Sequence, residues 1–196
     1  MATPWISMSM QPRSTVRLIV EVQPRYGILY LSTLYALQAF FYAANYASLA
    51  LSFSMPKILL ASCLMSPVLG MIWLTFMSYV FQWTGRLLGG TAKQLHLASA
   101  LAWSKLPQLL FIPFWLAYLF FYPEEVFILG AGEPSPILLT ALAFGIGLWS
   151  QLLRIQALRE LQGFSFLRAL VNAALGWFMG VIAFFGAFCL LRFFAV

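Results

Sequence analysis

Long uncharged hydrophobic stretches alternate along this chain with short segments that carry almost all of its charges. The stretch from Tyr26 to Pro56 contains no charged residue, and further apolar stretches follow it. A helix needs roughly 20 apolar residues to cross the hydrocarbon core of a bilayer. On that length the pattern predicts five membrane-spanning helices, at about residues 27–51, 58–83, 106–122, 136–158 and 168–193.

The predicted fold is therefore all-α, a polytopic membrane bundle of five transmembrane helices with an N-terminal interfacial amphipathic helix. Only helices and closed barrels satisfy their backbone groups in lipid, and the apolar runs are continuous rather than alternating, which excludes barrel strands. The composition agrees, because 63% of the residues are hydrophobic and only 8% are charged, against about a quarter charged in soluble domains. We expect residues 1–26 to form a cytoplasmic arm and residues 27–196 to form the transmembrane domain.

The arm, "QPRSTVRLIVEVQPR", has the pattern of an amphipathic helix. Pro12 suits a helix start and Pro24 a helix stop. Five apolar residues share a broad arc of that helix: Val16, Leu18, Ile19, Val20 and Val22. We expect the helix to lie in the membrane interface with its apolar side toward lipid. Its role stays open between a topological anchor and docking onto the other cytoplasmic segments or a partner.

Lysine and arginine predict the orientation. An odd number of spans places nine of the eleven basic residues on one side: Arg13, Arg17, Arg25, Arg86, Lys93, Lys105, Arg154, Arg159 and Arg168. The other side holds two basic residues and three glutamates: Lys57, Arg192, Glu124, Glu125 and Glu133. The N-terminus is therefore predicted to be cytoplasmic and the C-terminus to lie on the opposite face.

The basic segments predict anionic headgroups of the bilayer as a partner. Eight residues are the candidates for contact with headgroups or a partner protein: Arg13, Arg17, Arg25, Arg86, Lys93, Lys105, Arg154 and Arg159. A net charge of +6 could also suggest nucleic acid. These residues, however, stand singly between apolar runs rather than on one face of a soluble domain, so nucleic acid is excluded as a partner.

The segment "GRLLGGTAKQLHLASALAWSKLPQLL" is predicted to be an interfacial elbow. Gly89 and Gly90 end one helix, because each glycine lowers helix propensity by about 1 kcal/mol. Thr91 can cap a second helix over 92–105 that lies at the membrane interface, and Pro107 then interrupts it. Gly89, Gly90 and Pro107 are therefore the candidate hinge residues.

Residues for catalysis or metal binding are sparse. The chain contains no aspartate, five glutamates and a single histidine, His96. A metal site needs several ligands and a catalytic triad needs an acid to orient its base. We therefore expect no catalytic residue, no metal and no cofactor, and we interpret His96 as a polar residue at headgroup level.

Six amides lie within or near the predicted spans: Gln38, Asn45, Gln82, Gln108, Gln151 and Asn172. Such amides usually bond to a neighbouring helix, although they could also line a polar pathway. In "NAALGWFMG", Asn172, Gly176 and Gly180 share one face and allow close helix approach. That face predicts packing inside the monomer or, as a sharper alternative, the seam of a homo-oligomer.

Three segments together resemble the Yip family of five-span membrane proteins: "QPRSTVRLIVEVQP", "LGGTAKQLHLASALAWSKLPQLL" and "LQGFSFLRALVNAAL". The matching positions are Pro12-Arg13, Gly89-Gly90 with Lys93, Pro107, and Ser165 with Ala169. The resemblance implies an early secretory location and an association with prenylated Rab GTPases for eukaryotic members, which have a longer cytoplasmic N-terminal region. Here only the residues up to Arg25 precede the first span, and this short arm argues against GTPase binding. The arm is similar to that of prokaryotic members, which implies a location in the cell membrane.

The hypothesis from sequence is a non-enzymatic membrane protein of Yip type. It would act in interaction, membrane organisation or complex scaffolding through its basic cytoplasmic segments. Two alternatives remain open: a small permease or lipid-translocating protein whose amides line a groove, and an accessory subunit of a larger membrane complex.

Overall fold

The computed structural model describes residues 4–131 and 136–194, with side chains over 4–131 and 141–186. Every regular element in these ranges is helical. The elements are α1 (Pro4–Met10), α2 (Pro12–Val22), α3 (Ile28–Tyr46), η1 (Leu49–Leu51), α4 (Met55–Leu87), α5 (Gln94–Ser104), η2 (Leu106–Leu110), α6 (Phe111–Phe121), α7 (Pro136–Gln162) and α8 (Phe166–Phe194). The predicted all-α bundle is confirmed.

Within the described residues, four helical segments are long and apolar enough to cross a membrane: Met55–Leu87, Gln94–Phe121, Ala141–Gln162 and Phe166–Gly186. The multi-pass membrane character is therefore confirmed, but the predicted fifth span is not clearly supported. The missing candidate is α3, whose apolar sequence is interrupted by tyrosines and by Gln38 and Asn45. The segment Gln94–Phe121 is not one straight helix either, since it contains α5, η2 and α6.

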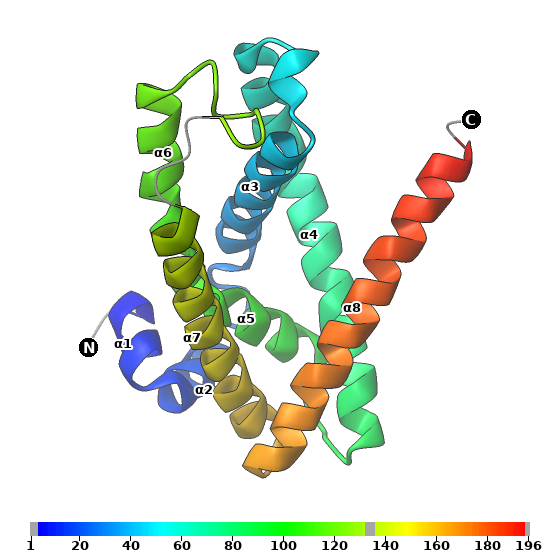
Figure 1. Cartoon of the computed structure of the whole chain (residues 1–196). Helices are drawn as coiled ribbons and strands as arrows, with labels where there is room; N and C mark the ends of the chain where they lie inside the picture. Colours follow the sequence, from blue (N-terminus) through cyan, green and yellow to red (C-terminus); the bar gives the residue numbers. More distant parts are fainter. Residues whose placement is uncertain (1–3, 132–135, 195–196) are drawn as a thin grey trace.

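Figure 1 shows α3 running beside α4 between the two ends of the bundle, and the two helices are in extensive contact. The arm, the α4–α5 turn and the α7–α8 turn gather at one end. The α3–α4 connection and the chain after α6 lie at the other end. The three segments in which we found nine basic residues are thus brought together by the fold.

A topology experiment distinguishes four spans from five. Cysteines introduced by Ser14→Cys in the arm and Ser52→Cys after α3, with Cys63 and Cys189 replaced, should label from opposite faces of the membrane. The reason is that α3 alone separates these exposed positions. Labelling is measured with a membrane-impermeant maleimide in oriented vesicles. Labelling of both cysteines from one face would show that α3 does not cross.

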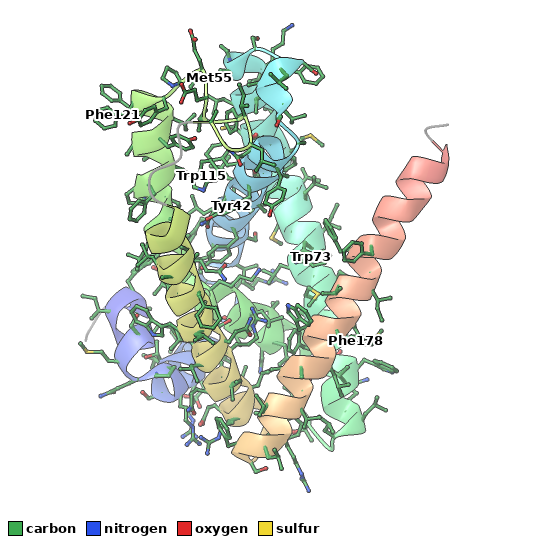
Figure 2. The ribbon with its side chains drawn as sticks, in the orientation of Figure 1. Tyr42, Met55, Trp73, Trp115, Phe121 and Phe178 are labelled. Carbon is green, nitrogen blue, oxygen red and sulfur yellow. The ribbon has the colours of Figure 1, made fainter. Side chains whose placement is uncertain are left out.

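Large apolar side chains cover the outer faces of the long helices. In Figure 2, Trp73 on α4, Phe121 at the end of α6 and Phe178 on α8 stand away from the helix axes. Phe121 is 69% exposed and Phe178 57% exposed. Apolar surface of this extent on several helices is what a lipid-facing exterior requires.

Helix α5 lies at the centre of the bundle, in contact with α2, α3, α4 and α7. All eight residues from Leu97 to Ser104 are buried. The helix expected here is present, and it is enclosed by protein rather than lying on the outer surface of the bundle. Five of these eight residues are alanine or serine, and their small side chains let neighbouring helices approach α5 closely.

A second apolar cluster lies at the opposite end of the bundle, under the chain that follows α6. Val126 and Phe127 are fully buried there. Asn45 Nδ2 donates to the Val126 carbonyl at 2.9 Å and, over a longer distance of 3.4 Å, to the Ile128 carbonyl. This intramembrane amide therefore fixes a connecting segment to α3 instead of joining two helices.

Candidate functional site

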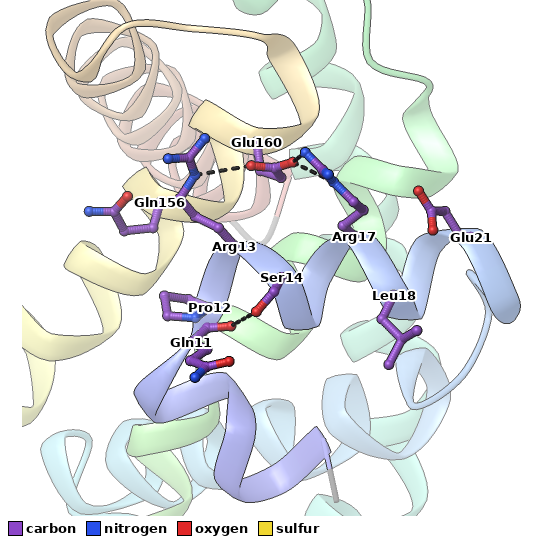
Figure 3. Close-up of a pocket in the computed structure, with 9 residues that line it drawn as sticks. All are labelled: Gln11, Pro12, Arg13, Ser14, Arg17, Leu18, Glu21, Gln156 and Glu160. Atoms are coloured by element: carbon purple, nitrogen blue, oxygen red, sulfur yellow. Dashed lines mark hydrogen bonds and ion pairs between the residues drawn. The ribbon is translucent and has the colours of Figure 1, made fainter. Parts of the chain in front are cut away.

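A single carboxylate of α7 binds two arginines of the N-terminal arm (Figure 3). Arg13 Nε donates to Glu160 Oε2 at 3.0 Å, and Arg17 Nε donates to Glu160 Oε1 at 2.7 Å. Arg17 Nη2 also donates to Oε1. The Glu160 side chain is only 7% exposed, whereas the two arginine side chains are more than half exposed. One buried acid thus anchors two exposed cations.

The apolar face of α2 packs on protein, and α2 contacts both α5 and α7. Val16, Ile19 and Val20 are buried in the main core cluster, while Leu18 and Val22 remain exposed. The amphipathic helix that the sequence predicted is present, but its buried face is turned toward the bundle rather than toward lipid. The bundle can accept it because α5 and α7 present buried apolar residues at this end.

Helix α1 extends this docking, and the sequence did not predict it. Met8 is fully buried in the main core. Trp5 stacks on Tyr30 and meets Trp103 edge-on at a ring distance of 5.4 Å. Trp103 in turn donates from Nε1 to the Tyr26 carbonyl at 3.0 Å. The arm is therefore an integral layer of the fold.

An open groove of about 620 Å³ lies along the junction of arm and α7 (Figure 3). Most of the residues that line it have polar or charged side chains: Gln11, Pro12, Arg13, Ser14, Arg17, Leu18, Glu21, Gln156 and Glu160. Each arginine uses some of its N–H groups to bind Glu160. Both guanidinium groups have further N–H donors, and both side chains are more than half exposed. The groove can therefore receive an acidic group from a headgroup or a protein segment.

Removing the charge of Glu160 tests the docking. Glu160→Gln should loosen the arm, because both arginines lose their charged acceptor. We expect the free energy of opening the arm to fall by about 1 kcal/mol, a small value because the arginines are exposed to solvent. Hydrogen exchange of the amides of α2 reports the opening. Glu21→Gln is the matched control, since Glu21 lines the same groove without an ion pair among the described residues. Equal exchange in both variants would contradict the anchoring role of Glu160.

The glycine pair after α4 forms a defined helix end. Gly89 has φ +85, a conformation that a side chain disfavours. Gly89 N–H donates to the Arg86 carbonyl at 3.0 Å and Gly90 N–H to the Gly85 carbonyl at 2.8 Å. These two bonds make a Schellman motif. Lys93, rather than Thr91, occupies the N-cap of α5, so the expected capping by Thr91 was wrong.

Gln162 at the end of α7 closes this elbow. Its Oε1 accepts from the Ala92 N–H at 3.1 Å. A Cβ at Gly85 or Gly90 would lie within 2.2 Å of the Gln162 amide, so the glycines leave space for this side chain. Pro107, the third candidate hinge residue, is buried in η2. In the structure these positions form a packed turn. Their movement as a hinge stays a prediction.

The eight basic candidates are placed differently. Arg13, Arg17, Arg25, Arg86 and Lys93 are exposed. Arg159 is half-buried over the Phe166 ring, Lys105 is partly buried, and Arg154 is only 7% exposed. We call the five exposed residues the basic end surface.

The amides and the small face of α8 are placed inside the protein. Gln38 and Gln82 donate to the backbone carbonyls of Gln108 and Ala92, each at 3.2 Å. Asn172 is fully buried and its Oδ1 accepts from Thr84 of α4 at 2.7 Å. Gly176 faces Phe81 and Gly180 faces Met77, both also on α4. The face predicted from Asn172, Gly176 and Gly180 thus lies against α4.

Sequence reasoning missed Glu160 and Gln162. The position of Glu160 could have indicated its role, because it is the only acidic residue in the segment that contains Arg154, Arg159 and Arg168. His96 is half-buried near the start of α5. In residues 4–131 and 136–194, no three metal-ligating side chains come together.

A protein-family model described as the Yip1 domain matches residues 6–188, which is nearly the whole chain. This match confirms the resemblance that was inferred from the arm, the glycine pair and the start of α8. Neither the curated proteins nor the solved structures contain a match to this chain.

Proposed function

This chain belongs to the Yip1 domain family, and from that premise we propose that it is a non-enzymatic membrane protein acting through its basic end surface. That surface would bind anionic lipid headgroups or an acidic partner protein and so organise the membrane or a complex around the bundle. We place it at the cytoplasmic face, following the positive-inside rule, with the C-terminus opposite.

The observation that carries this proposal is the docked arm. Arg13 and Arg17 come from α2 and lie against Glu160 of α7, more than half exposed. Arg86 in the last turn of α4 and Lys93 at the N-cap of α5 flank the α4–α5 turn, which lies at the same end of the bundle. Segments far apart in the sequence therefore combine their positive charge on one surface, which is the arrangement that attracts an anionic membrane surface.

The permease alternative has weaker support. A polar pathway needs side-chain amides that are free to meet a solute. Gln38, Asn45 and Gln82 instead hydrogen-bond to backbone carbonyls of the described chain.

Charge removal tests the proposed surface. Arg86→Gln with Lys93→Gln should weaken selectivity for anionic lipid, by about 1 kcal/mol for each residue removed. High salt should have the same effect, because it screens exposed charges. The measurement is the preference of the reconstituted protein for spin-labelled phosphatidylglycerol over phosphatidylcholine in its boundary layer.

Two controls accompany that experiment. Arg86→Lys with Lys93→Arg keeps the charges and should keep the selectivity. His96→Ala should change little, because we assign His96 no ligand or proton role. If His96→Ala removes the selectivity while the glutamine variants retain it, the surface is not the working site.

A further inference from the structure

Two cations lie within the bundle, apart from the basic end surface, and one of them is buried. Arg154 on α7 is 7% exposed, and its guanidinium lies 5.9 Å from the centre of the Phe81 ring. Lys105, between α5 and η2, places Nζ 5.6 Å from the centre of the Tyr35 ring. Helix α7 packs on both α5 and η2, so the two cations lie on elements in contact, and like charges in one region of a protein repel each other.

Neither cation has an anionic partner in the described part of the chain. The ion pairs found there join Glu160 to Arg13 and Arg17. Arg154 Nε is enclosed without a hydrogen-bond acceptor among the described residues, and no hydrogen bond of the Lys105 ammonium occurs there. The sequence offers no aspartate. The aromatic rings attract the cations but leave their N–H donors unbonded.

Two hydroxyl groups near these cations also lack a partner in the same described residues. Ser150 is fully buried and its Oγ is unbonded; it precedes Arg154 by four positions and so shares its helix face. The Tyr35 hydroxyl, whose ring lies beside Lys105, is unbonded as well. Buried donors of this kind are normally satisfied. Four donor groups from three parts of the fold are thus left without acceptors.

We propose that Lys105 and Arg154, with the hydroxyls of Ser150 and Tyr35, bind a phosphoryl group inside the bundle. A phosphoryl group places negative charge between two like cations and has several oxygens that accept from guanidinium, ammonium and hydroxyl donors. Arg154 lies six residues before Glu160, so the site is about 9 Å deeper along α7 than the anchor of the arm. At that depth the group can belong to an anionic phospholipid that enters between helices, or to free phosphate.

Ligand-dependent stability of the purified protein tests the site. The full chain, delipidated in neutral detergent, is heated with phosphatidylglycerol, with phosphatidylcholine or with inorganic phosphate. Phosphatidylglycerol or phosphate should raise Tm with a saturable dependence on its concentration. A rise with the lipid alone identifies a headgroup site, and a rise with inorganic phosphate identifies a free anion. No rise with either would overturn the proposal.

Arg154→Gln and Lys105→Gln should each weaken the apparent Kd for that ligand by at least about tenfold, because each removes one of the two charges that bind it. Without ligand the same variants should be no less stable than wild type, since each relieves repulsion between like charges. Arg86→Gln, which removes an exposed charge, should leave this Kd unchanged. Should either buried variant fold poorly, Arg154→Lys provides a charge-conserving comparison that retains binding. Equal affinity in Arg154→Gln, Lys105→Gln and wild type would refute the site.

Discussion

Gly70→Ala is expected to destabilise the protein in detergent by about 2 to 3 kcal/mol, the upper range for overpacking a close contact. A Cβ at Gly70 would lie 2.4 Å from the Ser32 carbonyl oxygen and 2.8 Å from its carbon. These are backbone atoms of α3, so no side-chain rotation can relieve the clash. The whole of α3 would have to move away from α4, and Tm measured by thermal denaturation should fall.

The matched control for this prediction is Gly145→Ala. Gly145 also lies within a long helix, α7, but a Cβ there meets no neighbouring atom within 4 Å. That substitution should leave stability unchanged or increase it by up to about 1 kcal/mol through helix propensity. A Tm for Gly70→Ala equal to that of Gly145→Ala would mean that α3 and α4 do not approach as closely as described.

The close approach at Gly70 explains how α3 can belong to the bundle although it is not among the four apolar candidates. Two of its polar residues contact protein: Ser32 is buried and its Oγ donates to the Leu29 carbonyl at 2.9 Å, and the Gln38 side chain donates to the Gln108 carbonyl. A helix with such residues is stabilised by its protein neighbours more than by lipid. Loosening the α3–α4 contact should therefore affect the membrane insertion of α3 as well.

Proline and glycine at helix ends made much of the fold predictable from sequence. Pro12 marks the start of α2, and Gly89 and Gly90 mark the end of α4. Each acts through its own backbone, by fixing φ or by allowing a positive φ, so no knowledge of distant residues is needed.

The features that sequence did not predict depend on partners far along the chain. Arg13 and Glu160 are 147 positions apart. A side chain at position 70 would clash with the backbone of Ser32, so this position requires glycine. We expected helix α5 at the membrane interface because it lies between two predicted spans. In the structure it contacts four other helices, including some from distant parts of the chain. Hydrophobic pattern thus indicates which segments avoid water, but not whether lipid or protein covers them.

Bulky side chains on the face of α8 that lies on α4 should destabilise the protein. Gly176→Leu with Gly180→Leu should lower stability in detergent by about 3 kcal/mol, because larger side chains force the helices apart. Gly176 should dominate: a Cβ there would lie 2.5 Å from the fully buried Phe81 ring, which is also covered by Arg154. At Gly180 the neighbour is the flexible end of Met77, 3.0 Å away.

Single alanine substitutions and an open control on the same helix separate this packing role from a dimer seam. Gly176→Ala should lower Tm clearly, Gly180→Ala little, and Gly186→Leu not at all, because a Cβ at Gly186 meets nothing within 4 Å. Thermal denaturation combined with size-exclusion chromatography measures both properties. If the double leucine variant keeps its Tm but changes its oligomeric state, the face joins two copies of the chain. A fall in Tm without a change in size places the contact inside one copy, where Phe81 must yield to the new side chain.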